Sequence, residues 1–357
     1  MNAPQPTLHV DKRPQPVGAA SPRLTVPAIF QMMQAYKITA LLATGIELGV
    51  FDCMAAGATD ALTVATRLHL DPRATKLLMN ALAAIGLLEP SGGGHRLSPE
   101  TDSYLVRKRP GYVGDMTRVM ASRWEWSAIQ QLPEAVRKGG TVMPEHAETP
   151  GYEYWEDFAA HATAVAKPTA ELTAEVIAHW ASGRRRLDIL DVACGHGMYG
   201  FTLARQHPQA HVWSLDWPNV LPIAHGHAVQ MGVADRVSMI AGDMFTIPLG
   251  GPYDVVMVTN VLHHFSEQRA TELLRRLCAV LCSGGRLIVV GFAVGEGPAA
   301  MDPAPHLFSI LMLVWTTQGE VHSMAAYERM MAGAGLLSSN VYNVPGLPLH
   351  VMIADKP

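Results

Sequence analysis

The sequence predicts an α/β fold in which a mostly parallel sheet follows an N-terminal helical domain. From residue 186 onward, short apolar segments such as LDILDV, HVWSLD and DVVMVT alternate with helical stretches, which is the pattern of a mostly parallel sheet. Before residue 183 the chain is dominated by helical patterns. Its 357 residues are enough for about two domains, each with its own core.

Composition and charge exclude several classes of protein. Apolar residues make up 49% and charged residues 16% of the chain, which is typical of a compact globular protein. The formal net charge of -4 gives no electrostatic reason to bind nucleic acid or an anionic membrane. The four cysteines include no C-x-x-C pair, which favours reduced thiols. We therefore expect a cytoplasmic protein with no nucleic-acid or membrane partner.

The N-terminal end divides into an arm and an apolar helix. Residues 1–23 are rich in proline and lack a continuous apolar core, so we expect a disordered arm and not a signal peptide or anchor. The next segment, PAIFQMMQAYKITALLA, predicts a helix over 27–43 that opens with a proline and is apolar on nearly every face. Such a helix must be covered, and we expect a homodimer.

Residues 61–105 have the order of a winged helix. Two helical patterns, the second capped by Asp71 and opened by Pro72, precede the hairpin pattern LLEPSGGGHRLSP. A DNA-binding module is the alternative interpretation. However, its basic residues are matched by acids, whereas a groove-reading protein normally carries a basic excess. We favour a packing domain over 24–110.

Residues 111–182 are predicted to be helical and hold the aromatic clusters RWEWSAIQQL and GYEYWEDF. Core or interface packing is the commoner explanation of such clusters. The other interpretation is that they form the walls of a pocket for an aromatic substrate. It gains weight because a catalytic domain is expected to follow over 183–357.

Acids and glycines follow the predicted strands at the edge where ligands bind in parallel sheets. Asp191 and two glycines, Gly195 and Gly197, surround the end of LDILDV. Asp216 ends HVWSLD, where a carboxylate can accept two hydrogen bonds from a ribose diol. Asp243 ends RVSMIAGD, where it can accept a hydrogen bond from an exocyclic amine.

Neighbouring residues complete this interpretation. Met244 and Phe245 can sandwich a flat ring. An acid ahead of the glycines, Asp191, suits a ligand that presents an ammonium group. Gly200 occupies the third position of a G-x-G-x-x-G pattern, so a dinucleotide is not excluded by the glycines alone.

The chain resembles the class I S-adenosylmethionine-dependent methyltransferases. Within that class, residues 27–357 resemble the small-molecule O-methyltransferases, which include plant caffeate and flavonoid enzymes and bacterial natural-product tailoring enzymes. The motifs that carry the resemblance occur in family order: DVACGHG, LDWPNV, GDMF, NVLHHFSEQRATELLRR, GGRLIVV and SMAAYERMMAGAGL. The resemblance implies a Rossmann-like seven-stranded, mostly parallel sheet, and an N-terminal winged-helix-like dimerisation domain that interlocks two subunits.

The resemblance also implies which residues hold S-adenosyl-L-methionine and the acceptor. It assigns Asp191, Gly195 and Gly197 to the methionine moiety, Asp216 to the ribose, and Asp243 and Met244 to the adenine. Trp217, Phe245 and Thr259 complete the expected cofactor site. The expected acceptor pocket consists of Trp155, Phe158, Ala162, His264, His306 and Met312. One departure from the family is Ala193, which stands where the family has its first glycine.

His263 is the expected general base. A neutral imidazole suits proton removal from a hydroxyl, and NVLHHFSEQ places His263, His264 and Phe265 on the family's His-Asp-Trp positions. The acids that orient this histidine in plant enzymes are replaced by Gly291 and Val321. Asp302 or Glu320 could take over that role, or the acceptor could be acidic enough to need less help.

Three alternatives remain open at the level of sequence. The same histidine could serve C-methylation, since a deprotonated phenol or enol is nucleophilic at carbon. A metal could assist if His263, His264, His306 and His322 converge, although their spacing is not that of a helical metal motif, and we expect no metal. Finally, the fold could bind the cofactor without turnover, as a regulator.

Overall fold

The computed structural model describes residues 24–357, so the expected disordered arm, 1–23, lies outside the described residues. The chain divides into two compact units, 1–36 and 37–357. The predicted first helix is confirmed as α1 (Val26–Glu47). Several large apolar side chains on its first half are exposed in the single chain, including Phe30 at 55%, Met32 at 66% and Met33 at 65%.

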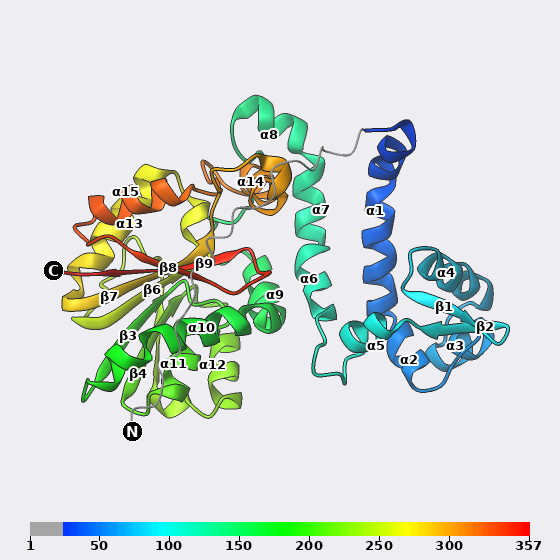
Figure 1. Cartoon of the computed structure of the whole chain (residues 1–357), viewed down its shortest axis with the longest axis horizontal. Coiled ribbons are helices and arrows are strands. Elements are labelled where there is room, and N and C mark those ends of the chain that lie inside the picture. The colour runs from blue at the N-terminus through cyan, green and yellow to red at the C-terminus, as the bar shows by residue number, and fades with distance from the viewer. Residues whose placement is uncertain (1–23) are drawn as a thin grey trace, which may run out of the picture. The chain divides into compact units, whose positions relative to one another are not determined.

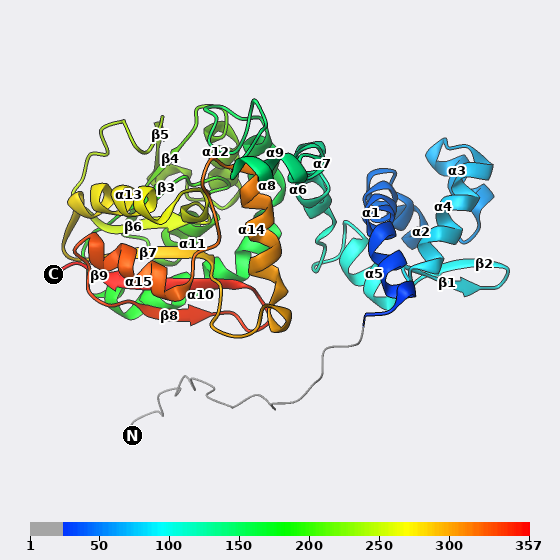
Figure 2. The same ribbon diagram turned by 90° about the horizontal axis from the view of Figure 1, so that it is seen from above.

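The winged-helix order predicted for residues 61–105 is confirmed. Asp71 accepts a 2.7 Å hydrogen bond from the Ala74 amide and so caps the second helix of the motif, which Pro72 opens. The predicted hairpin pairs Leu88 with Leu97 and lies beside α2 and α5 (Figure 2). The elements are α2 (Val50–Ala55), α3 (Ala61–Leu68), α4 (Pro72–Ala84), β1 (Leu88–Ser91), β2 (Gly94–Leu97) and α5 (Pro99–Leu105).

Helices occupy most of the segment from 114 to 182, as predicted. They are η1 (Gly114–Met116), α6 (Thr117–Met120), α7 (Arg123–Gln130), α8 (Leu132–Lys138), α9 (Tyr154–His161) and α10 (Thr163–Ser182). Side chains of this segment form an apolar cluster with the later helix α14 (Pro303–Trp315). The rings of Tyr154 and Trp315 lie at its centre, 4.4 Å apart and edge to face. Part of the aromatic content of this segment therefore serves packing.

A seven-stranded sheet forms the rest of the molecule, and its strand order is β5-β4-β3-β6-β7-β9-β8 (Figure 1). Five neighbouring strands are parallel, and β9 runs antiparallel to both of its neighbours. The strands are β3 (Leu187–Val192), β4 (Ala210–Asp216), β5 (Val237–Ala241), β6 (Tyr253–Thr259), β7 (Leu281–Phe292), β8 (Asn340–Asn343) and β9 (Leu349–Asp355). The predicted mostly parallel sheet and the predicted closing hairpin are confirmed.

Helices cover both faces of this sheet (Figure 1). One core contains α10, α11 (Met198–Gln206) and α12 (Leu221–Gln230), and the other contains α13 (Glu267–Ala279) and α15 (Met324–Gly333). Strand β3 is covered on both faces, and all its residues except Asp188 and Asp191 are apolar. The short turns are η2 (Ala234–Arg236), η3 (Leu262–His264) and η4 (Ala299–Met301).

The order of the strands reverses between β3 and β6, since β4 lies on one side of β3 and β6 on the other. Such a switch point leaves a crevice at the carboxyl ends of the strands. Within residues 24–357, no helix is both long and apolar enough to cross a membrane.

Candidate active site

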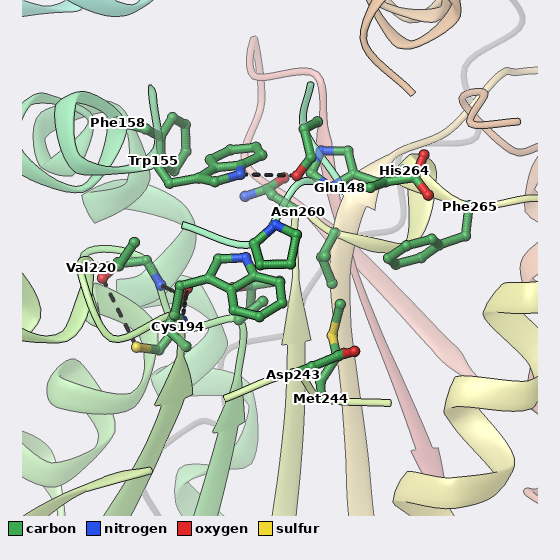
Figure 3. A pocket seen from close by; sticks show the side chains of 18 of the residues that line it. Glu148, Trp155, Phe158, Cys194, Val220, Asp243, Met244, Asn260, His264 and Phe265 are labelled. Atoms are coloured by element: carbon green, nitrogen blue, oxygen red, sulfur yellow. Dashed lines mark hydrogen bonds between the residues drawn. The ribbon is translucent and has the colours of Figure 1, made fainter. Parts of the chain in front are cut away.

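A cavity of about 1020 Å³, including its open mouth, lies at the carboxyl ends of β3, β4 and β6. Figure 3 shows Glu148, Trp155 and His264 toward its upper end and Asp243 and Met244 toward its lower end. After the roles expected from the sequence, we call these the acceptor end and the cofactor end. The lining residues are Ala147, Glu148, Pro150, Trp155, Phe158, Ala193, Cys194, Gly195, His196, Asp216, Trp217, Val220, Asp243, Met244, Phe245, Thr259, Asn260, Val261, His264, Phe265 and Arg269.

In the turn after β3, glycines allow the backbone to lie very close to neighbouring side chains. Oδ2 of the fully buried Asp191 accepts a 3.2 Å hydrogen bond from the Gly200 amide, and a Cβ at Gly200 would lie 2.8 Å from that oxygen. Gly197 begins α11 with a φ of 72°, and a Cβ there would overlap the ring of Phe201. Asp191 lies beneath the turn and is not a lining residue, whereas Gly195 lines the cavity.

Burial leaves Asp191 electrostatically uncompensated. Its Oδ1 is buried without a hydrogen-bond partner. Burial, opposed in part by the Gly200 amide, raises the pKa of Asp191 to about 8. A carboxyl in this condition is stabilised in its charged form by a nearby cation.

Asp216, at the end of β4, is a second buried carboxyl and lines the cavity. Its Oδ2 accepts from the Gly195 amide and its Oδ1 from the Trp217 amide, each at 2.7 Å. Burial raises its pKa to about 6, and the two amides oppose that shift. Since a carboxylate has four lone-pair sites, both oxygens keep the capacity to accept hydrogen bonds from a ligand.

Two lining residues other than glycine adopt left-handed backbone conformations. Ala193 has a φ of 52° and Asn260 a φ of 54°. Such conformations cost of order 1–3 kcal/mol and tend to occur at binding sites. The position at which this chain departs from the family, Ala193, is therefore one where a glycine would be conformationally favoured.

The lower end of the cavity provides a carboxylate beside apolar side chains. Oδ1 of Asp243 accepts a 2.9 Å hydrogen bond from the Phe245 amide. The Arg269 guanidinium lies over the Phe245 ring, 3.8 Å from its centre, and Met244 completes this wall. This end can hold a flat ring and accept a hydrogen bond from its edge.

The acceptor end is aromatic. Nε1 of Trp155 donates a 3.0 Å hydrogen bond to the Ala147 carbonyl, which fixes the indole. Its ring lies 5.8 Å from that of Phe158 and 5.3 Å from the imidazole of His264. Burial lowers the pKa of His264 to about 4, so this imidazole is neutral at pH 7.

His263 lies on η3 directly before His264 and is only 2% exposed. Its ring packs against Phe308 at 4.9 Å and against His264 at 4.8 Å, and its Nδ1 is buried without a partner. Burial, followed by the neighbouring His264 and His322, lowers the pKa of His263 well below its usual value. Unlike His264, it is not a lining residue of the cavity.

The turn that carries both histidines is held through its backbone. Nε2 of His322 lies 3.3 Å from the Leu262 carbonyl and 3.1 Å from the Phe265 carbonyl, the two residues that flank the histidine pair. A Cβ on Gly319 would lie 2.6 Å from the His263 carbonyl oxygen. Segment 319–322 is thus packed directly against η3. Within the described chain, neither Asp302 nor Glu320 contacts His263 or shifts its pKa.

The cavity brings together ten of the residues expected from sequence: Trp155, Phe158, Gly195, Asp216, Trp217, Asp243, Met244, Phe245, Thr259 and His264. Six others lie outside its lining: Ala162, Asp191, Gly197, His263, His306 and Met312. Ala162 and Met312 are each 1% exposed, and Met312 belongs to the aromatic cluster around Tyr154. His306 lies on α14.

Sequence reasoning missed several lining residues, among them Glu148, His196 and Asn260. Glu148 lies in a loop between α8 and α9, where no periodic pattern marks it. His196 stands between the two glycines of the turn, and its ring stacks 5.8 Å from that of Phe158. Asn260 directly follows β6, and this position after a strand could have drawn attention to it. Among residues 24–357, no three His, Cys, Asp or Glu side chains are grouped to hold a metal ion.

Comparisons with known proteins agree with this geometry. Residues 130–337 match the O-methyltransferase domain family and residues 30–107 match the O-methyltransferase dimerisation domain family. A 3-hydroxy-5-methyl-1-naphthoate 3-O-methyltransferase from Streptomyces sahachiroi is 31% identical, over 83% of this chain and 85% of the relative. Acetylserotonin O-methyltransferase from Mus musculus is 28% identical, over 92% of this chain and 88% of the relative.

Solved structures share the fold. A candidate O-methyltransferase from Nostoc punctiforme superposes with a TM-score of 0.87 at 30% identity, covering 93% of this chain and 100% of the other. Human N-acetylserotonin methyltransferase, solved in complex with SAM, gives a TM-score of 0.78 at 22% identity over 94% and 99% of the two chains. The chain therefore belongs to the O-methyltransferase family and is an S-adenosylmethionine-dependent enzyme.

Proposed function

We propose that this enzyme methylates a hydroxyl of a small aromatic acceptor and that His263 removes the acceptor proton. The observation that carries the proposal is a single cavity with two different ends. The ribose-binding and adenine-binding candidates, Asp216 and Asp243, lie in the same cavity as the aromatic side chains of Trp155 and Phe158. The relative from Streptomyces sahachiroi is named for a hydroxyl on an aromatic ring.

We further propose that Asp191, Gly195 and Gly197 receive the methionine moiety of the cofactor, Asp216 and Trp217 the ribose, and Asp243, Met244 and Phe245 the adenine, with Thr259 beside them. The unpartnered Oδ1 of Asp191 and the raised pKa of Asp216 support a ligand that brings positive charge and hydrogen-bond donors. Gly195 and Asp216 line the same cavity, and the side chains of Phe201 and Asp191 leave no room for a Cβ at Gly197 or Gly200. The unpartnered carboxyl oxygen and the lining carboxylates are the features that fit S-adenosylmethionine.

When bound, S-adenosylmethionine supplies an electrophilic methyl group on a sulfonium. Methyl transfer needs little more from the chain than alignment of the acceptor oxygen, exclusion of water and removal of one proton. Trp155, Phe158 and His264, which line the cavity, are proposed to hold the flat acceptor, and Ala162, His306 and Met312 lie outside the lining. Because burial lowers its pKa, His263 is neutral at pH 7 and can accept the proton at a ring nitrogen.

His264 is the competing base, because its side chain lines the cavity and that of His263 does not. The test is turnover of S-adenosylmethionine with a panel of phenols and naphthols, comparing His263→Ala with His264→Ala. Loss of turnover in the first variant, with cofactor affinity retained, is expected. Near-normal turnover in His263→Ala would reject its role as base.

We also propose that the enzyme is a homodimer, because the dimerisation domain family matches residues 30–107 and α1 exposes large apolar side chains in the single chain. Sedimentation at micromolar concentration should give a dimer, and a stable monomer would refute it. The proposed domains are 24–110 for dimerisation, 111–182 for the helical linker and pocket walls, and 183–357 for cofactor binding. A cytoplasmic location is proposed from the four free cysteines.

A further inference from the structure

Glu148 provides the only carboxylate at the acceptor end of the cavity among the lining residues of the described chain. The other lining carboxylates, Asp216 and Asp243, follow strands β4 and β5 and belong to the proposed cofactor site. Figure 3 shows Glu148 on the same side of the cavity as Trp155 and His264. A charged group among aromatic walls requires a partner or water, since burying it unpaired is costly.

The side chain of Glu148 is held in place by backbone contacts between two segments. Its Oε1 accepts a 2.6 Å hydrogen bond from the Thr317 amide, just after α14. The adjacent Ala147 amide donates to the Trp315 carbonyl at 3.0 Å, and the Ala147 carbonyl accepts from Trp155. The carboxylate is therefore held by Thr317, and the residue next to Glu148, Ala147, orients the Trp155 indole.

No cation of the described residues neutralises Glu148. None of the ion pairs within residues 24–357 includes it, and Oε2 has no hydrogen-bond partner among these residues. His264 is neutral at pH 7 because its pKa is about 4. The lining guanidinium of Arg269 is engaged over Phe245 and lies 3.7 Å from Glu272. The acceptor end therefore presents one uncompensated negative charge and no positive side chain.

We propose that Glu148 selects aromatic acceptors that carry an amino group or a second hydroxyl on the side facing Oε2, and that it rejects acceptors with a carboxylate there. A donor on the ring would form a charge-assisted hydrogen bond with Oε2, which is stronger than a neutral one. A ring carboxylate would face the like charge of this half-buried side chain at close range. This inference rests on the proposed aromatic acceptor and specifies its substituents.

The test uses four probes that share one flat ring: 2-naphthol, 7-amino-2-naphthol, 2,7-dihydroxynaphthalene and 7-hydroxy-2-naphthoate. Their affinities for the full-length enzyme saturated with S-adenosylhomocysteine are measured by calorimetry. The amino and dihydroxy probes should bind about tenfold to a hundredfold more tightly than the carboxylate probe. Plain 2-naphthol should fall between them.

The variant Glu148→Gln removes the negative charge of this side chain and keeps nearly the same shape. Its amide oxygen can still accept from Thr317, and its NH₂ group then faces the acceptor as a donor. The preference for amino and hydroxy probes should therefore collapse, and the carboxylate probe should bind better than it does to the unsubstituted enzyme. Glu145→Gln, an equal change at an exposed residue of the same loop that does not line the cavity, should leave all four affinities unchanged.

Four results would overturn the inference. Equal affinities of the unsubstituted enzyme for all four probes would show that Glu148 does not discriminate. Unchanged preferences in Glu148→Gln would assign the discrimination to another group. Weaker binding of S-adenosylhomocysteine to Glu148→Gln, with the preference among naphthols unaltered, would place Glu148 in the cofactor site. If no naphthol binds at all, the aromatic acceptor itself fails, and this inference falls with it.

Discussion

The carboxylates at the cofactor end of the cavity are held by backbone amides at strand ends, whereas the aromatic side chains at the acceptor end come from helices and loops. Asp216 accepts hydrogen bonds from two amides and ends β4, an inner strand of the sheet whose last residues are buried. Trp155 and Glu148 belong to α9 and to the loop before it, and contacts with the segment after α14 hold that loop. In the proposed function, the cofactor would thus be bound by the sheet, and the variable acceptor by segments that can change without disturbing the sheet.

The largest expected effect on activity comes from η3, the turn that carries His263 and His264. It distinguishes the acceptor end of the cavity from the cofactor end. His263→Ala should lower kcat by about 10²–10⁴ and leave the affinity for S-adenosylhomocysteine nearly unchanged, because a general base acts on the acceptor. His264→Ala should reduce kcat much less. Steady-state turnover with any accepted naphthol measures both. A larger loss in His264→Ala would move the base to the residue that lines the cavity.

A smaller effect on kcat is expected from His322, whose imidazole contacts the backbone of this turn. His322→Leu removes the contacts to the Leu262 and Phe265 carbonyls and should lower kcat by about tenfold to a hundredfold, because small misplacements of a catalytic group are costly. His322→Gln, whose amide can donate to the same carbonyls, should recover most of the activity. The comparison is made on kcat and KM together with the midpoint of thermal unfolding. If both variants lose activity only in proportion to folded protein, His322 is merely structural.

The cofactor end should respond to pH. Burial raises the pKa of Asp216 to about 6, and ribose hydroxyls bind the ionised form, so affinity should fall as pH drops through that value. At pH 7 the unsubstituted enzyme should bind S-adenosylhomocysteine more tightly than Asp216→Asn does. The ratio of the two affinities should fall by about tenfold between pH 7 and pH 5. Calorimetry with S-adenosylhomocysteine at both pH values checks this. A constant advantage would mean that Asp216 does not titrate in this range.

The smallest effect concerns backbone strain at the cofactor end. Ala193 has a φ of 52°, which disfavours any residue with a Cβ, so Ala193→Gly should increase the free energy of unfolding by about 1 kcal/mol. Urea denaturation with and without S-adenosylhomocysteine measures the change. A decrease in stability would show that the alanine methyl contributes packing that outweighs the strain.

The difference between residues at strand ends and residues on loops explains which parts of the site could be predicted from the sequence. Asp216 and Asp243 follow recognisable strands, and parallel strands bring their ends to one edge, so their position at one edge of the sheet could be predicted from periodicity. Glu148 lies in a loop whose position depends on tertiary contacts with Thr317, and no local pattern carries that information. The sequence also could not decide which of His263 and His264 lines the cavity, because both lie on a single 3₁₀ turn whose orientation is set by Gly319 and His322.

The division of the cavity into two ends is tested most directly by the affinity of S-adenosylhomocysteine for Asp216→Ala and for His263→Ala, measured by calorimetry at pH 7. We expect the affinity of Asp216→Ala to fall by about tenfold to a hundredfold, because the ribose hydroxyls lose a charged partner. We expect no significant change in His263→Ala. Equal losses in both variants, accompanied by lower thermal stability, would contradict the division of the cavity into a cofactor end and a catalytic acceptor end.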